Sequence, residues 1–157
     1  MNGLIIDDND RDYTSLKNVF DAIENEQENY NWLITAIEYA PVNPKIKLYE
    51  KPYTWITGED LTKLANTDDG FWIWGVFSGF AKNITKEDVL KSPLPFADGY
   101  TGFWNADLTI QHPLASIELV EWDGGLFLAI TENQVILNRL KEAFPASQDL
   151  KKYNLEP

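Results

Sequence analysis

Apolar residues in this chain recur at two spacings, and each spacing predicts a different kind of element. In residues 14–25 the apolar side chains of Leu16, Val19, Phe20 and Ile23 follow one another at helical intervals. This spacing predicts an amphipathic helix with one buried face.

Further helices are predicted from capping patterns at their N-termini. Residues 57–66 and 85–91 each begin with a threonine that is followed three positions later by an aspartate, close to a capping box. A longer helix is predicted over 132–144 with Thr131 as its N-cap, and a short one over 147–153.

Alternating or continuous apolar runs predict the strands. Residues 3–6 are a short apolar run, and residues 30–40 alternate, with Leu33, Thr35 and Ile37 expected on one face. A second strand is expected at residues 45–49, paired with the preceding one across a proline-containing loop.

The clearest unit is a hairpin over residues 115–131. Two apolar strands flank the Asp-Gly-Gly turn at residues 123–125, where glycine permits the positive φ angles of a tight turn. Alternation places Glu118 and Trp122 on one face of the first strand and Ile117 on the other.

The stretch "DDGFWIWGVFSGF", residues 68–80, is apolar at nearly every position after its first three residues. Alternation would place Phe71, Ile73 and Phe77 on one face and Trp72 with Trp74 on the other. Because both faces are apolar, the pattern is typical of a central strand buried on both sides. A tryptophan platform in a ligand groove is the alternative.

Together these elements predict the fold class. Strands and helices interleave without repeats or linkers over the 157 residues. We therefore expect a single α+β domain over residues 1–157, with a mixed, mostly antiparallel sheet and helices packed on at least one face.

Charge and composition narrow the possible partners. The chain carries 13 basic and 25 acidic residues, a net charge of −12. Nucleic acids and anionic membranes are therefore not expected to bind, whereas a basic protein would be attracted. Acidity that serves only solubility is the simpler interpretation. The first ten residues resemble no signal peptide, so a cytoplasmic protein is expected, with its oligomeric state open.

Several catalytic and metal chemistries are excluded by residue type. The chain has no cysteine and one histidine, His112, so thiolate chemistry and His-rich metal sites are absent. The acidic run at residues 7–12 does not begin a calcium-binding EF-hand, because the required glycine and the closing glutamate are missing. It does not begin a magnesium-binding receiver domain either, because the chain lacks the aspartate that such a domain carries after a later strand. We expect no cofactor and no metal, and a structural role for His112.

Two sets of residues are candidates for binding. Residues 92–106 form a loop rich in proline, glycine and aromatic residues, and the aromatic residues require either burial or a partner. The predicted partner-binding residues there are Asp98, Tyr100 and Trp104. The alternative is a small-molecule or carbohydrate site, binding or hydrolytic, that would use a carboxylate beside a tryptophan. Its residues would be Trp32, Glu38, Glu118 and Trp122.

Several segments together resemble a family of small, acidic, uncharacterised bacterial proteins. They are "YNWLITAIE", "ITGEDLTKL", "FWIWGVFSGF", "SPLPFADGYTGFWN", "IQHPLASIELVEWD" and "LKEAFPASQDLKKYN", and they cover most of residues 30–154. The resemblance implies an immunity protein, made to neutralise a toxin of its own lineage. It supplies no catalytic motif, so it implies binding rather than catalysis.

Overall fold

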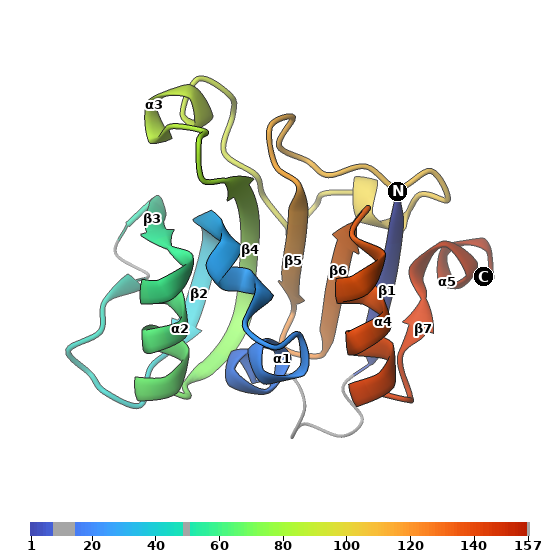
Figure 1. Cartoon of the computed structure of the whole chain (residues 1–157), viewed down its shortest axis with the longest axis horizontal. Helices are drawn as coiled ribbons and strands as arrows, with labels where there is room; N and C mark the ends of the chain where they lie inside the picture. Colours follow the sequence, from blue (N-terminus) through green and yellow to red (C-terminus); the bar gives the residue numbers. More distant parts are fainter. Residues whose placement is uncertain (8–14, 49–50, 157) are drawn as a thin grey trace.

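A computed structural model describes residues 1–7, 15–48 and 51–156, in which one seven-stranded sheet carries all the strands (Figure 1). The strands are β1 (Asn2–Asp7), β2 (Tyr30–Ala40), β3 (Tyr53–Thr57), β4 (Phe71–Ala81), β5 (Ile117–Trp122), β6 (Leu126–Thr131) and β7 (Gln148–Asp149). Their order in the sheet is β3-β2-β4-β5-β6-β1-β7. Every pair of neighbours is antiparallel, so the α+β class is confirmed and the sheet is not mixed.

The helices differ in length and in the face of the sheet that they cover. They are α1 (Leu16–Ala22), η2 (Glu26–Asn29), α2 (Gly58–Thr67), α3 (Lys86–Val89), η4 (Gly102–Trp104), α4 (Gln134–Ala143) and α5 (Leu150–Leu155). Helices α1, α2 and α4 lie in front of the sheet in Figure 1, and we call the side they cover the helix face. The opposite side, covered by η4, its flanking segments and α5, is the loop face.

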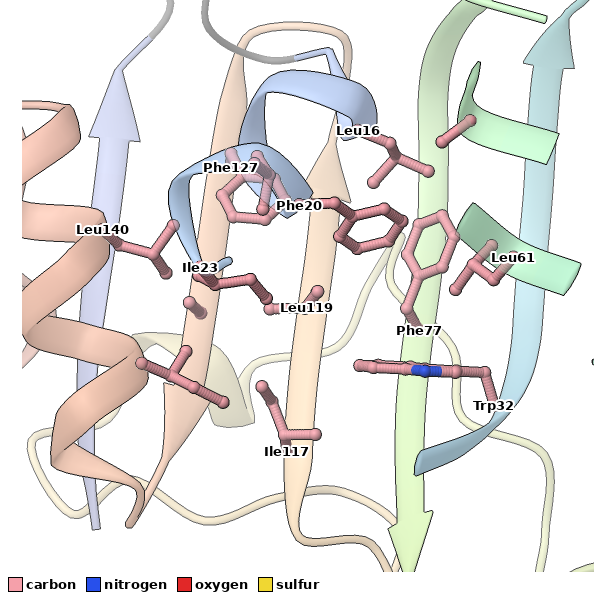
Figure 2. Close-up of a cluster of buried hydrophobic side chains, with 14 of the residues drawn as sticks. Leu16, Phe20, Ile23, Trp32, Leu61, Phe77, Ile117, Leu119, Phe127 and Leu140 are labelled. Carbon is pink, nitrogen blue, oxygen red and sulfur yellow. The ribbon is translucent and has the colours of Figure 1, made fainter. Parts of the chain in front are cut away.

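Each face carries its own apolar core. On the helix face, Phe20 of α1 and Leu61 of α2 lie beside Phe77 of the sheet, and Leu140 of α4 joins the same cluster on the side of Ile23 and Phe127 (Figure 2). On the loop face the cluster includes Ile5, Val76, Val120, Leu128 and Leu150. Because the adjacent residues Val76 and Phe77 are both fully buried, β4 is the central strand that its sequence predicts.

A bulge between β2 and β4 changes which side chains share a face. The register passes from Thr35 opposite Val76 to Glu38 opposite Trp74, and Ala36 has a positive φ of 53°. Beyond this point a further shift carries Trp72 to the helix face, where its ring lies 4.8 Å from that of Phe77.

The predicted alternation is therefore wrong past the bulge. Trp72 and Trp74 lie on opposite faces of the sheet and do not form one platform. Ile37 joins the helix face, whereas Leu33 packs on the other side. Ala36 carries no sequence signal for a bulge, because positive φ is ordinarily marked by glycine or asparagine.

Two local predictions are also corrected. Residues 45–48 form no strand, and β3 lies at Tyr53–Thr57, where aromatic and β-branched residues follow one another. Helix α4 is capped by Asn133, whose Oδ1 accepts from Val135 N at 3.1 Å. Thr131 instead donates its hydroxyl to the carbonyl of Ser116 at 2.9 Å.

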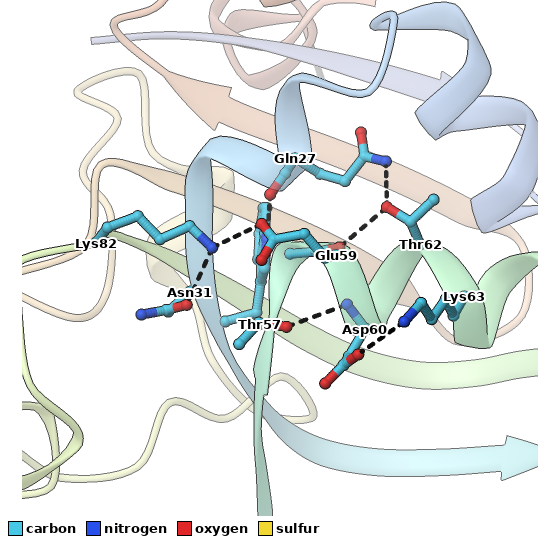
Figure 3. Close-up of polar contacts among 10 residues, drawn as sticks. Gln27, Asn31, Thr57, Glu59, Asp60, Thr62, Lys63 and Lys82 are labelled. Atoms are coloured by element: carbon cyan, nitrogen blue, oxygen red, sulfur yellow. Dashed lines mark hydrogen bonds and ion pairs between the residues drawn. The ribbon is translucent and has the colours of Figure 1, made fainter.

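The capping predictions for α2 and α3 are confirmed. The hydroxyl of Thr57 accepts a hydrogen bond from Asp60 N at 3.1 Å, and that of Thr85 from Asp88 N at 3.2 Å. The start of α2 also packs closely on η2 (Figure 3). A Cβ on Gly58 would lie 2.2 Å from the carbonyl oxygen of Gln27, so only glycine fits without movement.

Gln27 joins η2, β2 and α2 through its buried polar groups. Its Nε2 donates to Thr62 Oγ1 at 2.8 Å, and its carbonyl accepts from Trp32 Nε1 at 2.9 Å (Figure 3). Nearby, Lys82 Nζ lies 2.9 Å from Glu59 Oε1 and lowers the pKa of that carboxyl. These contacts fix α2 over β2 and so position the helix-face core.

Tyr39 and Asp68 connect the end of β2 to the end of α2. The Tyr39 hydroxyl donates to the Asp68 carboxylate, which also accepts from Asn43 N at 2.7 Å and Val42 N at 3.2 Å. Burial alone would raise the pKa of Asp68, but these hydrogen bonds outweigh it and the pKa lies below its ordinary value. The pair therefore holds the chain where it leaves β2.

Neither a metal-binding cluster nor a membrane-spanning helix is found among the described residues. The acidic run considered above for calcium and magnesium falls largely in residues 8–14, outside them. Within the described ranges no group of three or more His, Cys, Asp or Glu residues could hold a metal ion. Over the same residues, no helix has the length and apolar character needed to cross a membrane.

Candidate functional site: the aromatic loop

The connection between α3 and β5, residues 90–116, covers the loop face and is called the aromatic loop from here on. Apart from the short helix η4 it has no regular structure, because prolines and glycines recur along it. Gly99, with a φ of 84°, makes a turn that other residues adopt only with strain. The predicted ordered loop lies within this segment.

Aromatic rings connect the loop to the sheet in a continuous series. Tyr100 lies 4.6 Å from Phe103, which lies 6.0 Å from Trp122 on β5. Trp122 in turn contacts Trp104 at 5.0 Å and Trp74 at 4.9 Å, with edge-to-face geometry in each case. The aromatic residues predicted to need burial or a partner therefore bury much of their surface against one another.

Hydrogen bonds fix the backbone of the loop at two places. Gln111 donates from Nε2 to the Phe96 carbonyl and accepts at Oε1 from Phe96 N, both at 2.9 Å. Asn154 of α5 donates to the carbonyls of Phe103 and Asn105, also at 2.9 Å each. One pair of hydrogen bonds thus closes the loop on itself, and the other ties it to α5.

His112 is part of this framework and not a reactive group. It is buried, its Nε2 lies 2.8 Å from the Val89 carbonyl, and its Nδ1 accepts from Leu114 N at 3.1 Å. Since the carbonyl can only accept, Nε2 carries the proton, and both ring nitrogens are occupied. The structural role expected for His112 agrees with this geometry.

Glu118 is a buried acid between the sheet and the loop. It has no exposed surface, its Oε2 accepts from Gln111 N at 3.4 Å, and its Oε1 accepts from none of the described residues. Burial raises the pKa of Glu118 to about 8. The pKa of the Tyr100 hydroxyl is raised too, by burial and then by the Glu118 charge.

The surface of the loop is apolar where it reaches solvent. Phe96 is 50% exposed, Leu94 38% and Leu114 41%, and the exposed Asp98 follows two positions after Phe96. The two hydrogen bonds between Phe96 and Gln111 bring the segments around these residues side by side. An ordered loop that displays aromatic and aliphatic side chains beside a carboxylate is typical of a protein-binding surface.

The predicted partner-binding residues have different places in this loop. Asp98 is exposed, whereas Tyr100 and Trp104 are half-buried members of the aromatic series. Sequence reasoning missed Phe96 and Leu94 as the outward-facing residues, and it missed Gln111 as the residue that holds them. The apolar residues of "PLPF" were the available signal, because the prolines keep that segment out of regular structure.

The four residues of the alternative site are not brought together. Trp32 is fully buried on the helix face, whereas Glu118 and Trp122 share the loop face. Glu38 is exposed on β2, beyond the bulge, opposite Trp74. The bulge and the sheet order thus separate residues that the sequence alone had grouped.

Comparison with known proteins finds no relative of this chain. No protein-family model, curated protein or solved structure matches this chain. The family resemblance noted above stays an expectation, and function rests on the geometry of the loop.

Proposed function

We propose that this chain is a non-catalytic, cytoplasmic bacterial protein that binds another protein, and that it acts as an immunity protein against a basic toxin. The observation that carries the proposal is the half-exposed Phe96 ring on a loop whose backbone Gln111 holds with two hydrogen bonds. Phe96, Leu94 and Asp98 form the centre of the binding surface, and Leu114 lies at its side.

The proposal follows from the energetics of protein interfaces. A few central aromatic and aliphatic side chains supply most of the binding free energy at such surfaces. A loop that is already ordered loses less conformational entropy on binding than a flexible one. Tyr100 contributes from beneath, because its ring packs against that of Phe96 at 5.3 Å and supports its orientation.

Charge supports a basic partner. With a net charge of −12 the chain attracts positive surfaces and repels phosphate backbones, so no nucleic acid is proposed as a ligand. Electrostatic attraction of this kind raises association rates more than it raises final affinity. An inhibitor that must find a toxin quickly benefits from such attraction.

Hydrolysis has less support than binding. Glu38 and Glu118 lie on β2 and β5, with β4 between them, opposite Trp74 and Ser78. A glycosidase needs two catalytic carboxyls that face the same bound substrate. Glu118 is also buried away from solvent.

The experiment is affinity capture with matched variants. Tagged wild-type protein, Phe96→Ser with Leu94→Ser, and the control Val135→Ser are each incubated with lysate of the source organism. Val135 is 53% exposed on α4, so its replacement removes similar apolar surface elsewhere. We expect a basic protein that wild type and the control retain and the loop variant loses. A partner retained equally by all three would exclude the loop as its site.

A further inference from the structure

A hollow of about 420 Å³ runs along β3, the outermost strand on one side of the sheet. We call it the edge hollow. The residues that line it are Lys51, Pro52, Tyr53, Thr54, Trp55 and Lys86. Its volume lies within the range of ligand-binding pockets.

The shape of the edge hollow follows the backbone of β3. Its lining includes the consecutive residues 51–55, whereas neighbouring side chains of a strand point to opposite faces. The hollow therefore lies against the edge of the strand and not against one face alone. That edge pairs with none of the described strands, since β2 occupies the other side. Unpaired strand edges accept an added strand from another chain.

The charge of the edge hollow is opposite to that of the whole chain. Lys51 and Lys86 are the charged residues of its lining, and neither forms an ion pair with a carboxylate of the described residues. Lys51 and Lys86 thus place two positive charges on one hollow of a chain whose net charge is −12.

Two aromatic side chains, Tyr53 and Trp55, line the hollow together with the two lysines. Lys86 Nζ lies 5.6 Å above the centre of the Tyr53 ring. Tyr53 and Trp55 share the loop face and pack against the buried Leu33 and Phe80, so their positions are fixed. A ligand here would meet packed rings and two ammonium groups, whose rotatable donors suit carboxylates.

We propose that the β3 edge binds an extended acidic peptide as an additional strand. The peptide backbone would pair with the free edge of β3, and its carboxylates would pair with Lys51 and Lys86. The alternate side chains would lie over Tyr53 and Trp55. This site differs in both charge and location from the aromatic loop, so it concerns a second partner and does not depend on the function proposed above.

The test uses fluorescence anisotropy with a labelled peptide that alternates glutamate and threonine. We expect wild-type protein to bind it at low ionic strength, and to bind the same peptide with lysine in place of glutamate at least about tenfold more weakly. Lys86→Glu and Lys51→Glu should each weaken binding of the acidic peptide about tenfold. Lys63→Glu is the matched control, because Lys63 lies on α2 outside the lining and its reversal changes the net charge equally.

A second peptide tests the backbone pairing. N-methylation at alternate positions removes the donors needed for strand addition but keeps the carboxylates. Loss of binding on methylation supports the added strand, whereas unchanged binding overturns it. The proposal is also overturned if the acidic peptide does not bind, or if Lys63→Glu weakens binding as much as Lys86→Glu. Because Phe96 and Leu94 lie outside the hollow, their variants should bind the peptide normally.

Discussion

Gln111 and Phe96 form two hydrogen bonds of 2.9 Å across 15 positions of sequence, from side-chain amide to backbone in both directions. The amide thereby satisfies both backbone groups of Phe96 as a neighbouring strand would. The ring of Phe96 is half-exposed, so this backbone support acts together with the contact to the Tyr100 ring. One glutamine thus orders the most exposed aromatic side chain of the loop.

Gln111→Ala should therefore loosen the loop without disrupting the sheet. Loss of two hydrogen bonds is expected to lower the free energy of unfolding by about 1–2 kcal/mol. The backbone amide of Phe96 should exchange with solvent markedly faster, as measured by hydrogen exchange. Gln134→Ala is the control, since Gln134 bonds only to exposed side chains on the far face. Equal exchange at Phe96 in both variants would contradict this role of Gln111.

Glu118→Gln should change how stability depends on pH. The folded-state pKa of about 8 lies above the ordinary value of 4.5, so the folded protein holds a proton that the unfolded chain has lost. Stability from this group is complete below about pH 4.5 and falls as the pH rises toward about 8. Glutamine does not ionise, so the variant should lack this decline.

The measurement is chemical unfolding of both proteins at pH 5 and pH 9. Relative to wild type, we expect Glu118→Gln to have a higher unfolding free energy at pH 9 than at pH 5. The change in this relative stability should be on the order of a few kcal/mol. Glu38→Gln serves as the control because Glu38 is exposed. If the pH dependence of Glu118→Gln matches that of wild type, Glu118 is not the buried acid described above.

Gly58→Ala should destabilise the protein although alanine favours helices. The added Cβ would lie 2.2 Å from Gln27 O and 2.8 Å from Tyr30 O, both backbone atoms that cannot rotate away. We expect a loss of about 1–3 kcal/mol in unfolding free energy, as for other overpacked sites. Gly125→Ala is the control, since its added Cβ would meet nothing closer than 4.0 Å. Equal stability of the two variants would contradict the close packing of α2 on η2.

Local signals predicted much of the fold. The Asp-Gly-Gly turn and the threonine caps of α2 and α3 depend on residues a few positions apart, and each is present. The faces of β5 follow its alternation, with Ile117 on one side and Trp122 on the other. Such features need no information from distant parts of the chain.

Features set by tertiary contacts were not predictable in the same way. The bulge at Ala36 depends on how β2 pairs with β4, and no residue type marks it. The second strand lies at β3, which ends at Thr57, the residue that also caps α2. Apolar periodicity gave no reason to end one element and begin the other at the same residue.

The candidate site was predictable as a segment but not residue by residue. The composition of residues 92–106 indicated an ordered loop whose aromatic residues need burial or a partner, and Asp98, which we predict to bind the partner, is exposed there. That Trp104 turns inward follows from Trp122, and that Phe96 turns outward follows from Gln111. Both partners lie outside the segment, so its own sequence could not distinguish them.

Hydrogen exchange in the presence of the captured partner tests the central claim most directly. Backbone amides are followed by mass spectrometry in the free protein and in the complex. We predict that exchange slows in the segments that contain Phe96, Asp98 and Leu114, with little change over α4. Slowed exchange confined to α4 or other surfaces, with residues 94–98 unchanged, would contradict binding through the aromatic loop.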